Sequence, residues 1–226
     1  MIPFLTIFTR CCKRPKMLAR NLASVRDQLG SVPLEQLLVV DRQHRGLRWA
    51  NERFHVHRDL PRGEYVYPAD DDHWFENLEF VRDVRAAAER WDYPDVMLVR
   101  IYQRNPEWRI LPPPMIWDVE WESGERPALW VGAGTNVVVK SEVWRTNAWR
   151  YYAGQGDTWK TGGDWFFITG LLGLDLRIVR ADTMGVTGER SKGEVDGNAG
   201  GGWFERATAD FSPDRIAEGV WRMEYA

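Results

Sequence analysis

Apolar and polar positions along the first forty residues predict strands and helices in turn. Residues 3–9 (PFLTIFT) form an apolar run rich in strand-forming residues and too short for a helix, so they predict a buried strand. Pro15 suits the first position of a helix, which Gly30 should end. Residues 34–41 (LEQLLVVD) predict a second buried strand with an acidic residue at its carboxyl end. Apolar positions recur at helical spacing between these strands, at Leu18, Leu22, Val25 and Leu29.

The same alternation continues to about residue 104. Residues 46–54 are expected to form a short irregular unit, and residues 63–69 (GEYVYPA) another strand. Apolar residues at helical spacing from Trp74 to Trp91 predict a long amphipathic helix, and residues 96–102 predict a further strand. Strands that alternate with helices indicate an α/β fold with a mostly parallel, Rossmann-like sheet flanked by helices.

The pattern changes in the second half of the chain. Residues 105–129 are rich in proline and contain the alternating stretch WDVEWE, which predicts an edge strand or flap. A strand over residues 135–140, a helix from Gly163 and a last strand over residues 176–179 follow. The glycine-rich residues 185–202 are expected to form a lid or a disordered loop. No linker divides the chain, so we expect a single domain.

Composition and charge exclude several classes of protein. The chain has 226 residues and a formal net charge of −3, which argues against a protein that coats polyanions. Its two cysteines, Cys11 and Cys12, are adjacent, so a disulfide between them is sterically implausible. A reduced, cytoplasmic location is therefore expected. No apolar run approaches the roughly 20 residues that cross a membrane, so no stable membrane insertion is expected.

Three consecutive carboxylates, Asp70, Asp71 and Asp72, follow the predicted strand over residues 63–69. Ligands of open α/β sheets bind beyond the carboxyl ends of the strands, and carboxylates there can hold a divalent cation that neutralises a diphosphate. Alternatively, the acids form a turn and cap the following helix. The residues alone leave both interpretations open.

Several segments occur in an order that resembles a known family. TIFTR, then RPKMLARNLASVRDQ, then LLVVD and GEYVYPADDDHW resemble the nucleotide-binding half of family-2-like glycosyltransferases with the GT-A fold. The insertion Cys11-Cys12-Lys13 before Arg14-Pro15 departs from the family pattern. The resemblance implies a nucleotide-sugar-binding half at residues 1–104 and an acceptor-binding half at residues 105–226.

The resemblance also implies roles for single residues of the first half. Thr9 and Asp41 would hold the base and ribose of a nucleotide diphosphate sugar, with Arg10 beside them. Asp70 would lie near the ribose and share a Mn²⁺ or Mg²⁺ ion with Asp72, whereas Asp71 is the weaker ligand. Taken alone, Asp41 would be interpreted as a turn acid at a strand end. His73, beside the acids, is expected to support them indirectly or to face solvent.

In the second half, the segment GGDWFF resembles the family's acidic segment at the start of the acceptor-side helix. Its Asp164 would be the catalytic base, although the same residue suits a helix N-cap, and Gly163 stands where the family often has Glu. Arg190 and Lys192 would close over the diphosphate or belong to a solvated loop. Aromatic residues suited to stacking on an acceptor sugar are Trp117, Trp121 and Trp165, although most tryptophans are expected in the core.

The resemblance therefore implies a metal-dependent, inverting glycosyltransferase that uses a nucleotide diphosphate sugar, with a UDP-sugar favoured. The acceptor hydroxyl could belong to a glycan, a lipid carrier, a protein or a modified nucleic-acid base. Two other classes remain as alternatives: a nucleotidyltransferase on a similar scaffold, and a non-catalytic carbohydrate-binding protein. The first usually has a glycine-rich loop after the first strand, which residues 9–15 lack.

Overall fold

We analysed a computed structural model of the chain. It describes residues 2–28, 30, 32–43, 45–104, 108–111, 136–153, 163–189 and 202–225. The expected edge strand at residues 117–122 lies outside these ranges.

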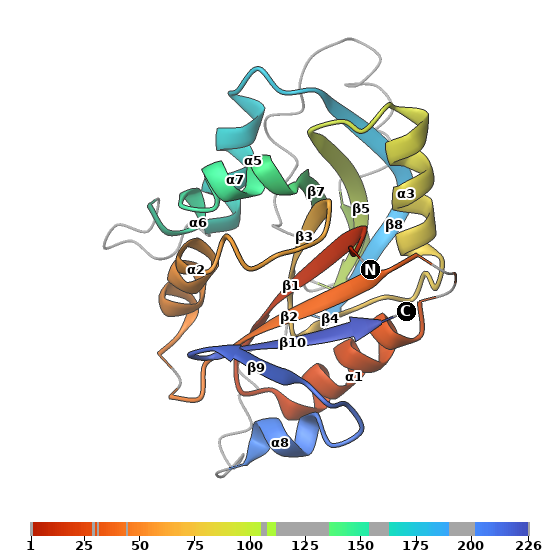
Figure 1. Cartoon of the computed structure of the whole chain (residues 1–226). Coiled ribbons are helices and arrows are strands. Elements are labelled where there is room, and N and C mark those ends of the chain that lie inside the picture. The colour runs from red at the N-terminus through yellow and green to blue at the C-terminus, as the bar shows by residue number, and fades with distance from the viewer. Residues whose placement is uncertain are drawn as a thin grey trace.

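Three parallel strands form the centre of the sheet (Figure 1). Strand β1 (Leu5–Cys11) lies between β2 (Leu34–Val40) and β3 (Tyr65–Asp70) and is parallel to both. Helix α1 (Pro15–Arg26) connects β1 to β2, as the apolar spacing predicts. All residues of β1 and β2 are buried because helices cover both faces of the sheet.

The complete sheet is mixed, because later strands join both sides of this centre antiparallel. Its order is β4-β8-β5-β7-β3-β1-β2-β10-β9, with β6 paired to β5. Strands β5 and β8 pair in parallel, whereas β7 joins β3 and β5, and β10 joins β2, antiparallel. The remaining strands are β4 (His73–Trp74), β5 (Val96–Arg104), β6 (Trp108–Leu111), β7 (Val137–Lys140), β8 (Ile178–Glu189), β9 (Asp214–Ala217) and β10 (Val220–Tyr225).

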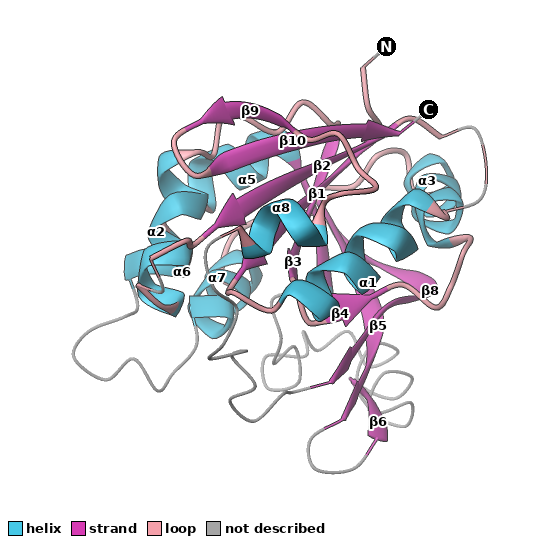
Figure 2. Cartoon of the chain, turned by 90° about the horizontal axis from the view of Figure 1, so that it is seen from below, coloured by secondary structure: helices cyan, strands magenta, loops and turns pink. Residues whose placement is uncertain are grey.

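Helices cover the two faces of the sheet as separate groups (Figures 1 and 2). One group consists of α1, α3 (Phe80–Arg90) and α8 (Trp203–Ala207). The other consists of α2 (Leu47–Val56), α5 (Ser141–Asn147), α6 (Arg150–Ala153) and α7 (Gly163–Leu172). Side chains along each strand alternate between these layers: Ile7 packs in the cluster that includes α3, and Phe8 in the cluster that includes α5 to α7.

Two elements differ from the sequence expectation near the acidic residues. The helix expected from Trp74 begins at Phe80, because His73 and Trp74 pair with Gly188 and Thr187 of β8 as strand β4. Residues 46–54, expected to be irregular, belong largely to helix α2. Each difference reflects tertiary pairing or packing that local apolar spacing does not reveal.

The predicted last strand and the glycine-rich lid also differ from the expectation. Strand β8 extends to Glu189, so the first residues of the predicted lid, 185–189, are strand. This extension pairs with β5 on one side and β4 on the other, which accounts for its length. Residues 190–201 lie outside the described part of the chain. Within the described residues, no helix has the length and apolar character needed to cross a membrane.

Candidate active site

The three consecutive acids lie in a tight turn between β3 and β4. Asp70 ends β3 opposite Arg10 of β1, and the N–H of Asp71 donates a 3.0 Å hydrogen bond to the carbonyl of Arg10. The chain then turns into β4, where His73 pairs with Gly188. A Cβ atom at position 188 would approach the Nε2 atom of His73 to 2.8 Å, so glycine provides the space for the imidazole. The turn therefore brings the acids to the carboxyl ends of the central strands.

Arg10 connects this turn to the second half of the chain. Its Nε and Nη2 atoms donate to the two carboxylate oxygens of Asp70 at 2.6 and 3.0 Å. Nη2 also lies 3.2 Å from Oδ1 of Asp164, and Nη1 donates to Asn51 of α2. Arg10 is only 3% exposed. Burial lowers the pKa of Arg10, but Asp164 and Asp70 raise it by more, so the guanidinium stays charged.

Arg14 holds the other two acids of the turn. Its guanidinium contacts both Asp71 and Asp72, and the N–H of Cys12 donates to Asp71 at 2.7 Å. The loop that carries Arg14 turns at Lys13, whose φ of 54° lies in the left-handed region. Burial raises the pKa of Asp71 to about 7 even though Arg14 opposes this change. Cys11, at the end of β1, and Cys12, in the loop, are both free, as their adjacency predicts.

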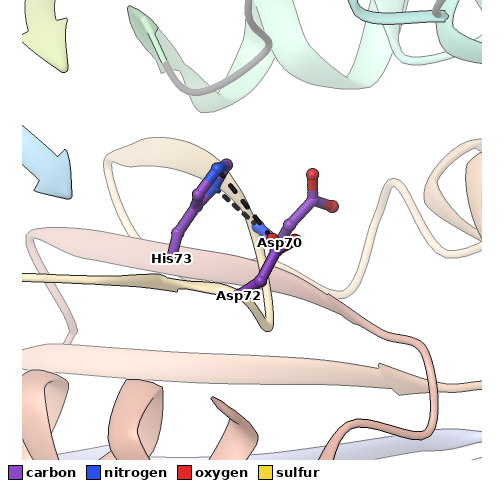
Figure 3. A group of neighbouring side chains, drawn as sticks. All are labelled: Asp70, Asp72 and His73. Atoms are coloured by element: carbon purple, nitrogen blue, oxygen red, sulfur yellow. Dashed lines mark hydrogen bonds and ion pairs between the residues drawn. The ribbon is translucent and has the colours of Figure 1, made fainter. Parts of the chain in front are cut away.

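Asp70, Asp72 and His73 together form a candidate metal site (Figure 3). Each offers a ligand atom, and these atoms lie within 4.8 Å of one another. Two carboxylates suit the hard cations Mn²⁺ and Mg²⁺, so the donor set fits the expected metal. His73 is buried, so of its two expected positions the solvent-facing one is wrong. Its Nδ1 atom accepts from the N–H of Asp70 at 3.4 Å, and its Nε2 atom lies 4.0 Å from Asp72.

Asp164 lies in the first turn of α7, where a negative charge favours the positive end of the helix dipole. Its side chain is 25% exposed, so the carboxylate contacts both Arg10 and solvent. The preceding residue is the glycine that departs from the family pattern. A Cβ atom at position 163 would lie 2.7 Å from Nδ2 of Asn51 and closer still to the carbonyl of Tyr151. The packing of α2 and α6 against α7 therefore excludes a glutamate there.

Thr9 and Asp41, the residues expected to hold the nucleotide, make contacts within the protein. The Thr9 hydroxyl is fully buried and accepts a 2.9 Å hydrogen bond from Gln36. Asp41 follows β2, where its carboxylate accepts from the N–H of Gly46 at 2.8 Å and lies 3.4 Å from Arg45. This geometry is that of a turn acid at a strand end, and a nucleotide-binding role for either residue stays a prediction.

Several predicted site residues have no described side chain. Arg190, Lys192, Trp117 and Trp121 lie outside the described residues. Trp165 belongs to helix α7, but only its backbone is described. Their proposed contacts with donor or acceptor therefore stay predictions.

Sequence reasoning assigned no role to two residues at the centre of this site. Arg14 belongs to an Arg-Pro motif, and nothing in the sequence indicates that it contacts acids more than fifty residues further along the chain. Asn51 lies in a segment without a recognisable motif, and only the packing of α2 against β1 brings it to Arg10. A charge-balance argument could have found Arg14, since buried acids require cationic partners, but no local signal points to Asn51.

Comparisons with known proteins identify the fold. No family model and no curated protein sequence matches the chain. Crystal structures of S. aureus TarS 1-349 match over 82–85% of this chain: the complex with UDP has a TM-score of 0.59 at 16% identity, and the complex with UDP-GlcNAc a TM-score of 0.61 at 15% identity. The chain spans 60% of the length of those TarS chains. The chain therefore has the GT-A-like fold of TarS, as its sequence resemblance predicts.

Proposed function

We propose that this protein is a glycosyltransferase that moves a sugar from a nucleotide diphosphate sugar to an acceptor hydroxyl. One observation carries the proposal: Arg10 links Asp70, on the expected donor side, to Asp164, the expected base, in one buried network. A fold that binds UDP and UDP-GlcNAc in TarS favours a UDP-sugar as the donor.

A divalent cation, Mn²⁺ or Mg²⁺, would be held by Asp70 and Asp72 with His73 beside them. The bound ion would neutralise charge on the diphosphate as it leaves. Four acids and two arginines form the described network, so its excess negative charge supports a cation requirement.

Asp164 would act as the general base of an inverting reaction. Its carboxylate takes the proton of the acceptor hydroxyl while the hydroxyl oxygen forms a bond to the anomeric carbon. The bond from that carbon to the diphosphate oxygen breaks on the opposite side, and the electron pair leaves with the diphosphate. The partial exposure of Asp164 supports this role because an acceptor can reach the carboxylate.

The remaining assignments complete the proposal. Thr9 and Asp41 would contact the nucleotide, and Arg190 and Lys192 the diphosphate. Acceptor contacts would come from Trp117, Trp121 and Trp165. A glycan, a lipid carrier, a protein or a modified nucleic-acid base would supply the hydroxyl, and a cytoplasmic location fits the two free cysteines.

Release of free nucleoside diphosphate from a panel of nucleotide sugars, measured with Mn²⁺ or Mg²⁺, tests the proposal. We expect release from at least one UDP-sugar, loss of release in Asp72→Asn, and retained donor binding with turnover reduced to a small residual rate in Asp164→Asn. Asp59→Asn, an exposed acid outside the network, is the matched control and should behave as wild type. Full turnover in Asp164→Asn would remove this residue from the base role, and pyrophosphate release instead would indicate nucleotidyl transfer. Failure of every nucleotide sugar to bind would contradict the proposed function.

A further inference from the structure

The contacts of Arg10 differ from those of a ligand-binding arginine. Its Nε, Nη1 and Nη2 atoms all contact protein groups, namely Asp70, Asn51 and Asp164. Because its side chain is almost entirely buried, a donor phosphate has almost no guanidinium surface to contact. The sequence resemblance implies a donor-binding residue at this position, but the geometry favours a different role.

The surroundings of Arg10 make its ionic contacts strong and rigid. Its guanidinium lies 5.4 Å from the ring centroid of Phe54 and 5.8 Å from that of Tyr151. Both rings are fully buried, so water does not screen the charges on these sides. A planar guanidinium has its donors in fixed directions, so the two hydrogen bonds to Asp70 orient it, and Nη2 then lies 3.2 Å from Oδ1 of Asp164 as an ion pair.

Asn51 completes this arrangement from helix α2. Its Oδ1 atom accepts from Arg10, whereas its Nδ2 atom is buried without a hydrogen-bond partner among the described residues. A buried unsatisfied amide is costly, so an apolar residue would be expected here unless the amide oxygen had a specific task. Orienting the third edge of the Arg10 guanidinium is such a task.

We propose that Arg10 is a positioning residue, oriented by Asn51, that holds the base Asp164 at a fixed place relative to Asp70 and the donor. This inference rests on the proposed function and gives Arg10 a role other than donor binding. Arg10 itself does not contact the substrate. Its effect on catalysis passes through Asp164, so its removal should lower kcat and leave the KM for the donor unchanged.

A double-mutant cycle tests the inference, with kcat and KM for nucleoside diphosphate release as readouts. Arg10→Lys keeps the charge but cannot form the fork, and we expect a fall in kcat of about 100-fold, typical of a misplaced catalytic group. Asn51→Leu should lower kcat by roughly tenfold, because only the orientation of Arg10 is lost. In the Asp164→Asn background neither change should lower kcat further, since groups that act as a unit are not additive.

Arg222→Lys is the matched control. Arg222 also contacts a buried acid, Glu35, but lies in β10 away from the network. This variant should lower the melting temperature and leave kcat unchanged, which separates general destabilisation from positioning. A raised KM in Arg10→Lys with unchanged kcat would overturn the inference in favour of donor binding, as would additive losses in the cycle. Wild-type turnover in Asp164→Asn alone would instead refute the proposed base.

Discussion

Two clusters of charged side chains lie at opposite ends of the central strands, each around a buried acid, and their charge balance differs. The Glu35 cluster consists of Glu35, Glu224, Arg62 and Arg222, two acids with two arginines. Glu35 is fully buried and accepts from the Thr6 hydroxyl at 2.6 Å. The carboxyl-end network consists of Asp70, Asp71, Asp72, Asp164, Arg10 and Arg14, four acids with two arginines.

This difference separates a structural cluster from a candidate functional one. In the Glu35 cluster each charge has an opposite partner, so the cluster is balanced without any bound ligand and a structural role is enough to explain it. In the carboxyl-end network the excess of acids opposes folding, since neighbouring carboxylates repel one another. Natural proteins retain such local conflicts mainly at functional sites. The imbalance, more than the presence of acids, therefore supports the carboxyl-end network as the candidate site.

The largest effect on stability should come from breaking the balanced cluster. Glu35→Leu would leave Arg222 partly buried without its acid, and we expect a loss of about 3 kcal/mol in the free energy of unfolding. Asp72→Asn should change this free energy by less than about 1 kcal/mol, because it removes repulsion as well as attraction. Urea unfolding of the two variants measures both values, and equal losses would contradict the comparison.

Divalent cations should stabilise the carboxyl-end network alone. At 100 times its dissociation constant, Mn²⁺ would raise the free energy of unfolding by about 2.7 kcal/mol. Asp72→Asn should lose this increment. Glu35→Leu should show the same increment with Mn²⁺, although its free energy of unfolding without Mn²⁺ is lower than that of the wild type. Thermal unfolding with and without Mn²⁺ measures the increment, and its retention in Asp72→Asn would exclude that carboxylate as a ligand.

The space beside His73 offers a smaller test of the site's packing. Gly188→Ala places a methyl group against the imidazole and should cost about 1–3 kcal/mol, as overpacking does. Gly173→Ala is the control, because its nearest atoms would lie 3.6 and 3.7 Å away, in ordinary contact. Comparable losses in both variants, measured by urea unfolding, would show that His73 does not fill the space beside Gly188.

The smallest effect should be seen at the cysteines next to the network. Burial, followed by the charge of Asp71, raises the pKa of Cys12 to about 12, and burial raises that of Cys11 well above its usual range. Iodoacetamide should therefore react slowly with the folded protein at pH 8 and rapidly after unfolding, because the thiolate is the reactive form. Asp71→Asn should speed the reaction of Cys12 by roughly threefold to tenfold, as a pKa lower by half a unit to one unit implies.

An exposed acid provides the control for this last experiment. Asp92 lies at the end of α3 with its side chain almost fully exposed, so Asp92→Asn should leave the rate of alkylation unchanged. An unchanged rate in Asp71→Asn as well would mean that burial alone protects the thiol.

The sequence predicted much of the first half because its signals are local. The apolar runs of β1 and β2 and the spacing of Leu18, Leu22 and Val25 lead directly to the observed strands and α1. The expected helix is present as α3, but its predicted start at Trp74 was wrong, because His73 and Trp74 pair with a strand more than a hundred residues away. The spacing of apolar residues contains no information about so distant a partner. Two paired residues are also too few to show the alternating pattern of a strand.

The amino-acid sequence by itself determined the order of the central elements, the position of the acids at a strand end and the free state of the cysteines. These features depend on neighbours in the chain. Only the tertiary structure decided which charges meet: Arg10 with Asp164 and Asn51, and Arg14 with Asp71 and Asp72. The physical reason is that a buried charge must find an opposite charge or a hydrogen bond wherever the packed elements bring one, irrespective of distance along the chain.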